Sequence, residues 1–334
     1  MGYTAGVGHE RESASHGMFE RRGAHRLPSS VQIEVDSRCN LRCPMCAVPR
    51  MDSAREVRTI EPSGFEELLA THFPHARRVM LCGFSEPLMN PHVPELVRIA
   101  HALGKDVNLA TNGLLLTPER AEVLVAAGLD DVALSFDTTD PEAYRLIRGV
   151  ARLPRLLENL RGLRRAIEKA KARLDIELHA VVSTHTIDAI EALLRFAAAE
   201  GAQLVTLIRE MPIGGQDVSR IRAAYAAIDW ASVTDLAREL GVGILFSDPR
   251  PEAVAGCYWA LNHSYVSIEG HVSPCQVASV DPAFRFGNVG DAPFASIFEG
   301  ARYVAFRDTV ERGEIPAPCR ECSCVFRSTP VPEP

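Results

Sequence analysis

Residues 39–46 read CNLRCPMC, with three cysteines at the spacing C-x3-C-x2-C. Thiolates are soft ligands that select zinc or iron–sulfur clusters. A structural zinc site and a closed four-iron cluster each take four protein ligands. No fourth cysteine follows nearby, and the next histidines, His72 and His75, have no matching spacing. Three thiolates on a four-iron cluster leave one iron without a protein ligand, so the loop predicts a cluster with an open position.

Short β-branched runs alternate with amphipathic segments on both sides of this loop, from residue 29 to about residue 250. Six runs are expected strands: 31–35, 77–82, 106–110, 131–136, 175–183 and 202–208. Among the segments between them, Thr117 fits the N-cap and Gly128 the C-cap of a helix, and the leucine spacing over 153–170 predicts another. Six β-then-α units predict an α/β fold with a parallel sheet, either an open or partial barrel or a doubly wound sheet. In both, chemistry belongs at the C-terminal ends of the strands.

The pattern changes after residue 250 to short strands, turn glycines and a helical stretch over 293–313. Gly270 permits a tight hairpin that would bring Cys257 and Cys275 together, and Cys319 and Cys322 follow at C-x2-C spacing. Two such pairs would close a tetrahedral zinc site or a four-thiolate cluster. We therefore expect a flexible arm over 1–28, a barrel over 29–250, a metal-stapled α+β domain over 251–326 and a disordered tail over 327–334.

Composition excludes several classes of function. A net charge of −7 argues against a nucleic-acid partner. The sequence has no apolar run of membrane-spanning length and no signal-peptide core, so we expect a cytoplasmic protein without a membrane partner. In a reducing compartment, the nine cysteines are better suited to metal ligation or thiol chemistry than to disulfides.

A C-x3-C-x2-C loop after a first strand resembles the signature of the radical S-adenosylmethionine (SAM) superfamily. The resemblance implies a partial (β/α)6 TIM-type barrel and a 4Fe-4S cluster on Cys39, Cys43 and Cys46. In that family SAM chelates the free iron, and the reduced cluster cleaves SAM to methionine and a 5′-deoxyadenosyl radical that abstracts a hydrogen atom from the substrate. A donor such as flavodoxin or ferredoxin would supply the electron. Met45 stands where the family often has an aromatic residue that covers the cluster.

The resemblance also implies SAM contacts at later strand ends. The stretch GFSEP (83–87) resembles a Gly-Gly-Glu-Pro motif that holds the SAM amino group, with Ser85 in place of a glycine. Glu86 would be the motif's carboxylate, although an ordinary helix-start carboxylate is the alternative. Further expected contacts with SAM or substrate are Asn112, Ser135, Asp137, Arg148, Ser183 and His185. Asn112 has a structural alternative as well, since it would suit a left-handed turn with Gly113.

The second cysteine set resembles the twitch domain, a shortened SPASM domain that holds one auxiliary 4Fe-4S cluster. Cys257, Cys275, Cys319 and Cys322 would be its ligands, with zinc as the alternative metal. Cys324 departs from the pattern and would be a substitute ligand, a reactive thiol or an idle neighbour. Cys82 stands apart from both sets and is either a small buried hydrophobe or a hydrogen-atom donor that faces the site.

Twitch-bearing relatives include dehydrogenases, epimerases, decarboxylases and peptide thioether formers. Residues 1–30 are too short and polar to form a peptide-recognition domain, which favours a small polar substrate. We expect two-electron oxidation of a secondary alcohol on a carbohydrate or aminocyclitol, with the auxiliary cluster as electron acceptor. Arg148, and Arg209 and Glu210 in the loop 209–218, are candidate substrate contacts. The alternatives are epimerisation with Cys82 or Cys324 as hydrogen donor, peptide modification, and a non-catalytic metal-cluster scaffold.

Overall fold

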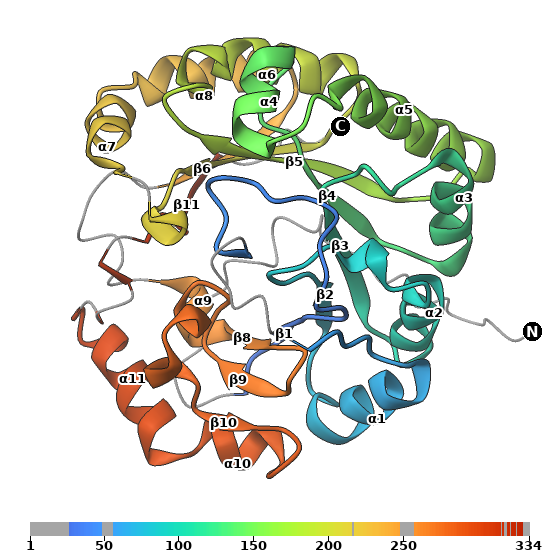
Figure 1. Cartoon of the computed structure of the whole chain (residues 1–334), viewed down its shortest axis with the longest axis vertical. Helices are drawn as coiled ribbons and strands as arrows, with labels where there is room; N and C mark the ends of the chain where they lie inside the picture. The colour runs from blue at the N-terminus through green and yellow to red at the C-terminus, as the bar shows by residue number, and fades with distance from the viewer. Residues whose placement is uncertain are drawn as a thin grey trace, which may run out of the picture.

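The computed structural model describes residues 27–48, 56–215, 217–247, 257–314, 316, 319–320, 322–324 and 326–329. Strands from these ranges form a single sheet of eleven, in the order β10-β9-β8-β1-β2-β3-β4-β5-β6-β7-β11. Figure 1 shows the sheet curving around the middle of the view with helices along its outer side. Most of the arm expected over 1–28 lies outside the described residues.

The first six strands are those expected from the sequence, and each pairs in parallel with the next. They are β1 (Ser30–Ile33), β2 (Arg78–Leu81), β3 (Asp106–Thr111), β4 (Asp131–Ser135), β5 (Asp175–Val182) and β6 (Leu204–Arg209). The helices between them are α1 (Pro62–His72), α2 (Val93–Ala102), α3 (Pro118–Ala127), α4 (Pro141–Arg148), α5 (Leu153–Ala170) and α6 (Ile190–Ala199). The expected α/β class is confirmed, and the curved sheet makes it a partial barrel.

Local signals fix the ends and faces of these helices. At the start of α3 the Thr117 hydroxyl accepts a hydrogen bond from the Arg120 N–H at 3.4 Å, and Gly128 ends the helix at φ +91°. Only a residue without a side chain adopts that conformation at no cost. On α5 four of the leucines that predicted the helix are buried in the core, namely Leu153, Leu156, Leu160 and Leu163.

Alternation along each strand separates the helix-covered face from the inside of the barrel. On β2, Val79 and Leu81 are fully buried under the helices. Arg78, Met80 and the following Cys82 line the central cavity instead. Polar residues at alternate positions of a strand therefore project inside the barrel.

The sequence reading missed a seventh parallel strand. β7 (Gly243–Ser247) pairs with β6 in parallel register, and α7 (Ser219–Ala226) and α8 (Trp230–Glu239) connect the two. The strand has only five residues, all buried, and such a short apolar run after a glycine has no periodicity that distinguishes it from a loop. Its addition extends the sheet beyond the six predicted units.

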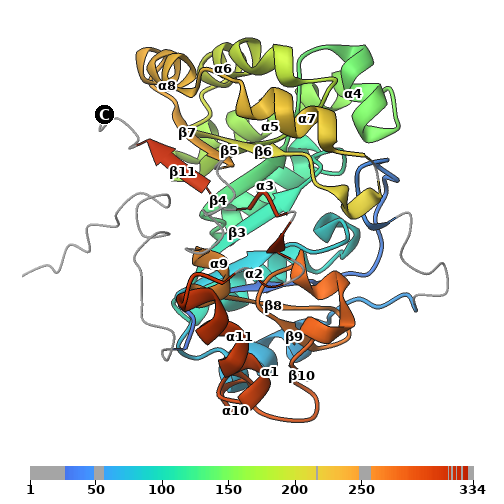
Figure 2. The same ribbon diagram turned by 90° about the vertical axis from the view of Figure 1, so that its left-hand side faces the viewer.

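The C-terminal region continues the barrel sheet and does not form a sheet of its own. α9 (Tyr258–Asn262) leads into β8 (His263–Val266), which pairs in parallel with β1. β9 (His271–Ser273) returns antiparallel to β8 through the predicted hairpin, with Gly270 at φ +86°, and β10 (Gly287–Asn288) pairs with β9. Figure 2 shows these strands gathered with α10 (Phe294–Phe298) and α11 (Ala301–Glu311) at one end of the molecule.

Two details differ from the expectation. The helical stretch predicted over 293–313 is two helices, α10 (Phe294–Phe298) and α11 (Ala301–Glu311). Gly300 between them has extended backbone, which a poor helix former adopts readily. The predicted tail is ordered at its start, because β11 (Phe326–Thr329) pairs antiparallel with β7. Among the described residues, no helix has the length and apolar character that a membrane crossing requires.

Candidate functional site

The three cysteines of the loop after β1 face one cavity of about 400 Å³ inside the barrel, at the C-terminal ends of the strands. The Cys46 N–H donates to the Cys43 carbonyl at 3.0 Å, which folds the loop into a tight turn. Burial raises the pKa of the Cys39 thiol to about 12, and the charges of Glu86, Cys43 and Cys46 add to the shift. Thiolates this close repel one another, so a metal centre is the natural partner that would hold them deprotonated.

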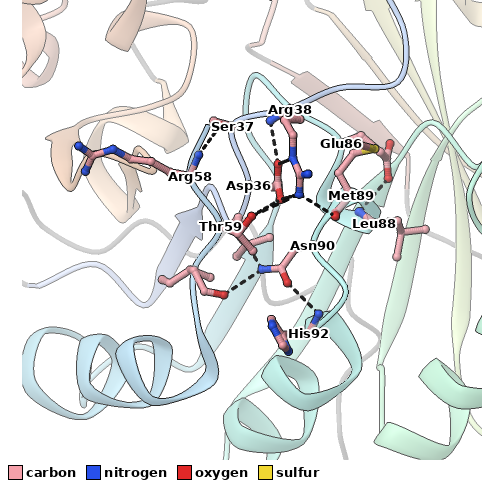
Figure 3. Close-up of polar contacts among 12 residues, drawn as sticks. Asp36, Ser37, Arg38, Arg58, Thr59, Glu86, Leu88, Met89, Asn90 and His92 are labelled. Atoms are coloured by element: carbon pink, nitrogen blue, oxygen red, sulfur yellow. Dashed lines mark hydrogen bonds and ion pairs between the residues drawn. The ribbon is translucent and has the colours of Figure 1, made fainter. Parts of the chain in front are cut away.

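Hydrogen bonds fix the start of this loop to the segment after β2, and an ion pair between Arg38 and Asp36 orients the arginine that makes them (Figure 3). Arg38 makes two contacts with the Asp36 carboxylate, at 2.9 and 2.8 Å, and its guanidinium donates to the Met89 carbonyl at 3.1 Å. The Glu86 N–H in turn donates to the Arg38 carbonyl at 2.9 Å. Asn90 donates to the Val35 carbonyl at 2.9 Å. The cysteine loop and the GFSEP loop are therefore held together as one unit.

The Glu86 carboxylate is buried and accepts three hydrogen bonds from the chain. The donors are the Thr111 hydroxyl at 2.6 Å, the Asn112 N–H at 2.8 Å and the Leu88 N–H at 3.1 Å. Burial raises the pKa of Glu86, while these donors favour the ionised form. Glu86 therefore caps the 3-10 turn Pro87–Met89 and also lines the cavity, which combines both readings of this residue.

Next to Glu86, the Ser85 hydroxyl makes no hydrogen bond with the described residues. Its Oγ is buried, and Ser85 lines the cavity. A buried hydroxyl without a partner is costly, so a ligand that bonds to it there would be stabilised. Gly83 allows the close approach of Glu34, whose Cγ would lie 2.6 Å from a Cβ at position 83.

Of the other expected SAM contacts, Met45, Asn112 and Ser135 line the cavity. The Asn112 amide donates to Asn40 of the cysteine loop at 2.7 Å and its oxygen accepts from the Leu114 N–H at 3.1 Å. Gly113 has φ +75°, so the left-handed turn is present as well. Asn112 thus ties the end of β3 to the cysteine loop.

Asp137 and Arg148 form a buried ion pair with each other. The Arg148 Nε and a terminal nitrogen meet the two Asp137 oxygens at 2.6 and 2.9 Å, and Asp137 also accepts from the Val181 N–H at 2.9 Å. Arg148 lines the cavity and is hydrogen-bonded to the Cys43 sulfur. Asp137 does not itself line the cavity but is joined to it through Arg148.

Ser183 follows β5, as expected, but does not line the larger cavity. Its hydroxyl accepts from the His185 N–H at 3.1 Å, so it caps the turn after β5. Ser183 and His185 line a second, smaller cavity of about 110 Å³, to which Met45 and Glu210 also contribute. They lie on the far side of Met45 from the larger cavity, because Met45 and Glu210 line both.

The second cysteine set borders the same cavity through Cys275. Cys275 and Cys324 line it, and Cys275 interacts electrostatically with Cys322, Cys257 and Cys319. Burial raises the pKa of Cys257 and of Cys319 to about 12. A hydrogen bond from Cys324 lowers the pKa of Cys322 instead. Cys324 is therefore not an isolated neighbour of the set.

Backbone contacts hold this set against the barrel. The Ser323 hydroxyl, between Cys322 and Cys324, donates to the Arg209 carbonyl at 2.6 Å. Backbone N–H groups point at the sulfurs of Cys275, from Ala278 at 3.4 Å, and of Cys322, from Cys324 at 3.3 Å. Such N–H···S contacts suit cluster ligation, where hydrogen bonds to sulfur tune the potential. Arg209 and Glu210, expected from the loop after β6, also line the cavity.

Cys82 lines the cavity, as the sharper reading of it requires. Burial raises the pKa of its thiol to about 12, with Glu34 adding to the shift, and Gln32 is hydrogen-bonded to it. Gln32 also donates to Gln276, the neighbour of Cys275, at 2.7 Å. A short polar bridge thus joins Cys82 to the second cysteine set.

Sequence reasoning missed a set of polar side chains in the barrel interior. These residues line the cavity from β2, β3, β5 and β6: Arg78, Asn108, Glu177, His179 and Thr206. The available signal was a polar residue at alternate positions of strands that were predicted to be buried in a parallel sheet, where apolar residues are the norm.

Within the described ranges, no three His, Cys, Asp or Glu side chains are grouped so as to hold a single metal ion. A four-iron cluster places each thiolate on a different iron, so its ligands need not converge on one point. The buried thiols, the N–H groups aimed at sulfur and the unpartnered Ser85 hydroxyl all fit a cluster with an adjacent ligand.

Comparison with known proteins agrees with this geometry. The profile of the radical SAM superfamily matches residues 33–197, and that of the SPASM iron–sulfur cluster-binding domain matches residues 257–323. The PqqA peptide cyclase of Ruegeria pomeroyi is 30% identical over 318 residues, which cover 89% of this chain and 80% of that protein. The AdoMet-dependent heme synthase of Methanosarcina barkeri is 27% identical, over 88% of each chain.

Solved structures of Streptococcus suis SuiB share the fold at 15% identity. The form bound to S-adenosylmethionine has a TM-score of 0.66 and covers 89% of this chain and 72% of that one. The form bound to precursor peptide SuiA has a TM-score of 0.62 and covers 84% and 66%. The chain therefore spans about two thirds of the length of SuiB in that complex.

A partial barrel with a cysteine triad at its strand ends defines an enzyme of the cluster-dependent radical class. The chain belongs to the radical SAM superfamily, and its C-terminal part is a SPASM-type domain. Membership implies two kinds of cofactor, 4Fe-4S clusters and S-adenosylmethionine. When bound, these groups supply a 5′-deoxyadenosyl radical for hydrogen-atom abstraction and an acceptor for a second electron.

Proposed function

We propose that this protein oxidises a peptide substrate by two electrons in a SAM-dependent radical reaction that forms a new bond within the peptide. The observation that carries the proposal is the shared cavity, because residues of both cysteine sets line the same space of about 400 Å³. A substrate in that space would lie between the source of the radical and the electron acceptor. Ligand sites in proteins commonly have volumes of this size.

The names of the relatives favour a peptide over the carbohydrate or aminocyclitol expected from the sequence. The relative at 30% identity is a peptide cyclase, and SuiB was solved with a precursor peptide. The expectation of a small substrate depended on residues 1–30 being too short for a peptide-recognition domain. A peptide could equally be recognised by the cavity itself or by a separate protein.

We assign a role to each of the site residues according to its position in the cavity. We assign Cys39, Cys43 and Cys46 to the first cluster, with Met45 over it. The unpartnered Ser85 hydroxyl, with Asn112 and Ser135, would contact SAM. Glu86 fixes the loop by its three accepted hydrogen bonds and presents its carboxylate to the cavity.

We assign the auxiliary cluster to Cys257, Cys275, Cys319 and Cys322. Cys324 lines the cavity beside Cys275 and is hydrogen-bonded to Cys322, which makes it a substitute ligand or a cavity thiol. Arg148 and Asp137 act as a pair: Asp137 holds Arg148, and Arg148 meets Cys43. Ser183, which caps a turn, is a positioning residue for the end of β5.

Deuterium transfer distinguishes a peptide from a carbohydrate. The holoprotein, reconstituted and reduced under anaerobic conditions, is incubated with SAM and with pools of randomised peptides in which one residue type is perdeuterated. Parallel samples contain perdeuterated glucose or inositol. We expect deuterium in 5′-deoxyadenosine from a labelled peptide pool and, from the same peptides without label, a product two mass units lighter than its precursor. Deuterium only from the sugar samples would instead support the dehydrogenase expected from the sequence.

A further inference from the structure

Three of the polar residues that line the cavity each carry a buried atom without a hydrogen-bond partner in the described part of the chain. They are Nε of Arg78, Oδ1 of Asn108 and Oγ1 of Thr206, each buried and without a hydrogen-bond partner among the described residues. Asn108 is 1% exposed and Thr206 is 3% exposed. Native proteins leave few buried polar atoms unsatisfied, so three of them on residues that line one cavity point to a ligand.

Asp131 determines which atoms Arg78 and Asn108 present. A terminal nitrogen of Arg78 donates to both Asp131 oxygens, at 2.7 and 2.8 Å. The Asn108 amide nitrogen donates to the same carboxylate. The Asn108 side-chain oxygen has no partner among the described residues, so it is the free atom of this amide. Asp131 thereby fixes one free donor on Arg78 and one free acceptor on Asn108.

The surrounding charge restricts what can bind there. Glu177 lines the same cavity and pairs with His179 at 3.2 Å. Burial opposes its ionisation, but the hydrogen bond from His179 and the charges of His179 and Arg78 lower the pKa of Glu177. Glu177 and the ionised form of Asp131 thus place negative charge on two sides of the single guanidinium of Arg78. A second anion would be repelled by both and would face an acceptor at Asn108.

We propose that Arg78, Asn108 and Thr206 form a subsite for a neutral group that both donates and accepts hydrogen bonds, namely a carboxamide or a hydroxyl of the substrate. A carboxamide oxygen would accept from Arg78 Nε–H while its nitrogen donates to Asn108 Oδ1. The Thr206 hydroxyl would take either role. Asp131 is the positioning residue of this subsite. The inference rests on the proposed function for the presence of a substrate in the cavity, but its binding chemistry is tested without turnover.

Acetamide and acetate are suitable probes because they have nearly the same shape and differ in charge and donor capacity. Each is titrated against dithionite-reduced holoprotein with SAM present, and the paramagnetic broadening of its methyl resonance by the nearby cluster is measured. We expect acetamide to be broadened at about tenfold lower concentration than acetate. Equal broadening of the two, or stronger broadening of acetate, would overturn the proposal.

Variants link the signal to the subsite. Thr206→Val keeps the shape and should weaken acetamide binding about threefold to tenfold, as should Asn108→Leu. Ser273→Ala is the matched control, because Ser273 also has a buried, unpartnered hydroxyl but does not line the cavity. Iron content and circular dichroism establish that each variant is folded. Unchanged acetamide binding in folded Thr206→Val and Asn108→Leu would contradict the proposal.

5′-Deoxyadenosine formation is measured in the same samples, so that failure of the subsite proposal can be distinguished from failure of the proposed function. If SAM is cleaved but acetamide and acetate behave alike, only the subsite is wrong. If SAM is not cleaved but acetamide is preferred, the subsite stands and the radical function fails.

Discussion

Arg148 joins Asp137 to the first cysteine set: it meets the carboxylate at 2.6 and 2.9 Å and is hydrogen-bonded to the sulfur of Cys43. Asp137 follows β4 and Arg148 ends α4, so two consecutive elements place a buried positive charge beside this thiol. Hydrogen bonds and charge near cluster sulfurs set the reduction potential. Arg148 is therefore expected to favour the reduced, more negative cluster.

Arg148→Gln should lower the reduction potential of the first cluster by about 50 mV, since about 1 kcal/mol of differential stabilisation is lost and 59 mV corresponds to a factor of ten for one electron. The measurement is a redox titration followed by electron paramagnetic resonance without SAM. Arg145→Gln is the control, because Arg145 lies on the same helix but is exposed and paired with Glu142. Equal potentials in the wild type and Arg148→Gln would contradict the role assigned to Arg148.

The two cysteine sets should lose iron independently. Cys43→Ser and Cys275→Ser should each reduce the iron content of the reconstituted protein from about eight to about four atoms per chain. Only Cys43→Ser should also abolish SAM cleavage. Cys82→Ser should retain all the iron, because Cys82 belongs to neither set. Full iron content in Cys43→Ser would show that this thiol is not a ligand.

The hairpin of the second set depends on Gly270. Gly270→Ala would force a side chain into a left-handed backbone at φ +86° and place its Cβ 2.6 Å from Asn288 Oδ1. Gly241→Ala meets a similar backbone at φ +68° with nothing within 4 Å, so it isolates the conformational cost of about 1 kcal/mol. We expect Gly270→Ala to lower the thermal midpoint more and to lose auxiliary iron, which Gly241→Ala should retain. Identical behaviour of the two variants would exclude the predicted clash.

Asp131 should make stability depend on pH. Burial raises its pKa to about 7, and Glu177 acts in the same direction although Arg78 opposes it. The folded state then binds a proton that the unfolded state releases near pH 4, so stability should fall as the pH rises from about 4 to about 7, by up to about 1.4 kcal/mol per unit.

Denaturant unfolding between pH 5 and pH 8 tests this slope. Asp131→Asn cannot titrate and should have a flatter curve than the wild type, whereas the exposed Asp235→Asn should leave the slope unchanged. Parallel curves for the wild type and Asp131→Asn would show that this carboxyl keeps an ordinary pKa.

Cys82 distinguishes oxidation from epimerisation. If the reaction is oxidative, Cys82→Ser should keep product formation within about threefold of wild type, because no hydrogen atom returns to the substrate. An epimerase would show product of unchanged mass, one solvent deuterium at the reacting carbon in heavy water, and loss of that product in Cys82→Ser. Mass spectrometry of the product in heavy water separates the two.

Much of the fold follows from local sequence signals. Thr117 and Gly128 predict the ends of α3, and the leucines of α5 predict its buried face. The cysteine spacing and the strand-end motifs predict most of the cavity wall, because parallel strands bring their C-terminal ends to one edge. β7 could not be predicted from local signals, because its strand conformation depends on pairing with β6 and not on its own five residues.

The hydrogen-bond partners of a side chain are harder to predict from the sequence than the place of its residue in the fold. Asp137 was expected beside SAM because it follows a strand, but whether it faces the cavity depends on Arg148, eleven residues later. The network of Arg78, Asn108 and Asp131 depends on the register of three strands, which the sequence does not specify. Charged residues in buried strands could have indicated it.

The most direct test of this account is SAM cleavage by the anaerobically reconstituted, dithionite-reduced protein, followed as 5′-deoxyadenosine by liquid chromatography. The account predicts its formation by the wild type and by Cys257→Ser, and its absence from Cys39→Ser, Cys43→Ser and Cys46→Ser. A first cysteine set that holds zinc, or a wild-type protein that binds iron but yields no 5′-deoxyadenosine, would contradict it.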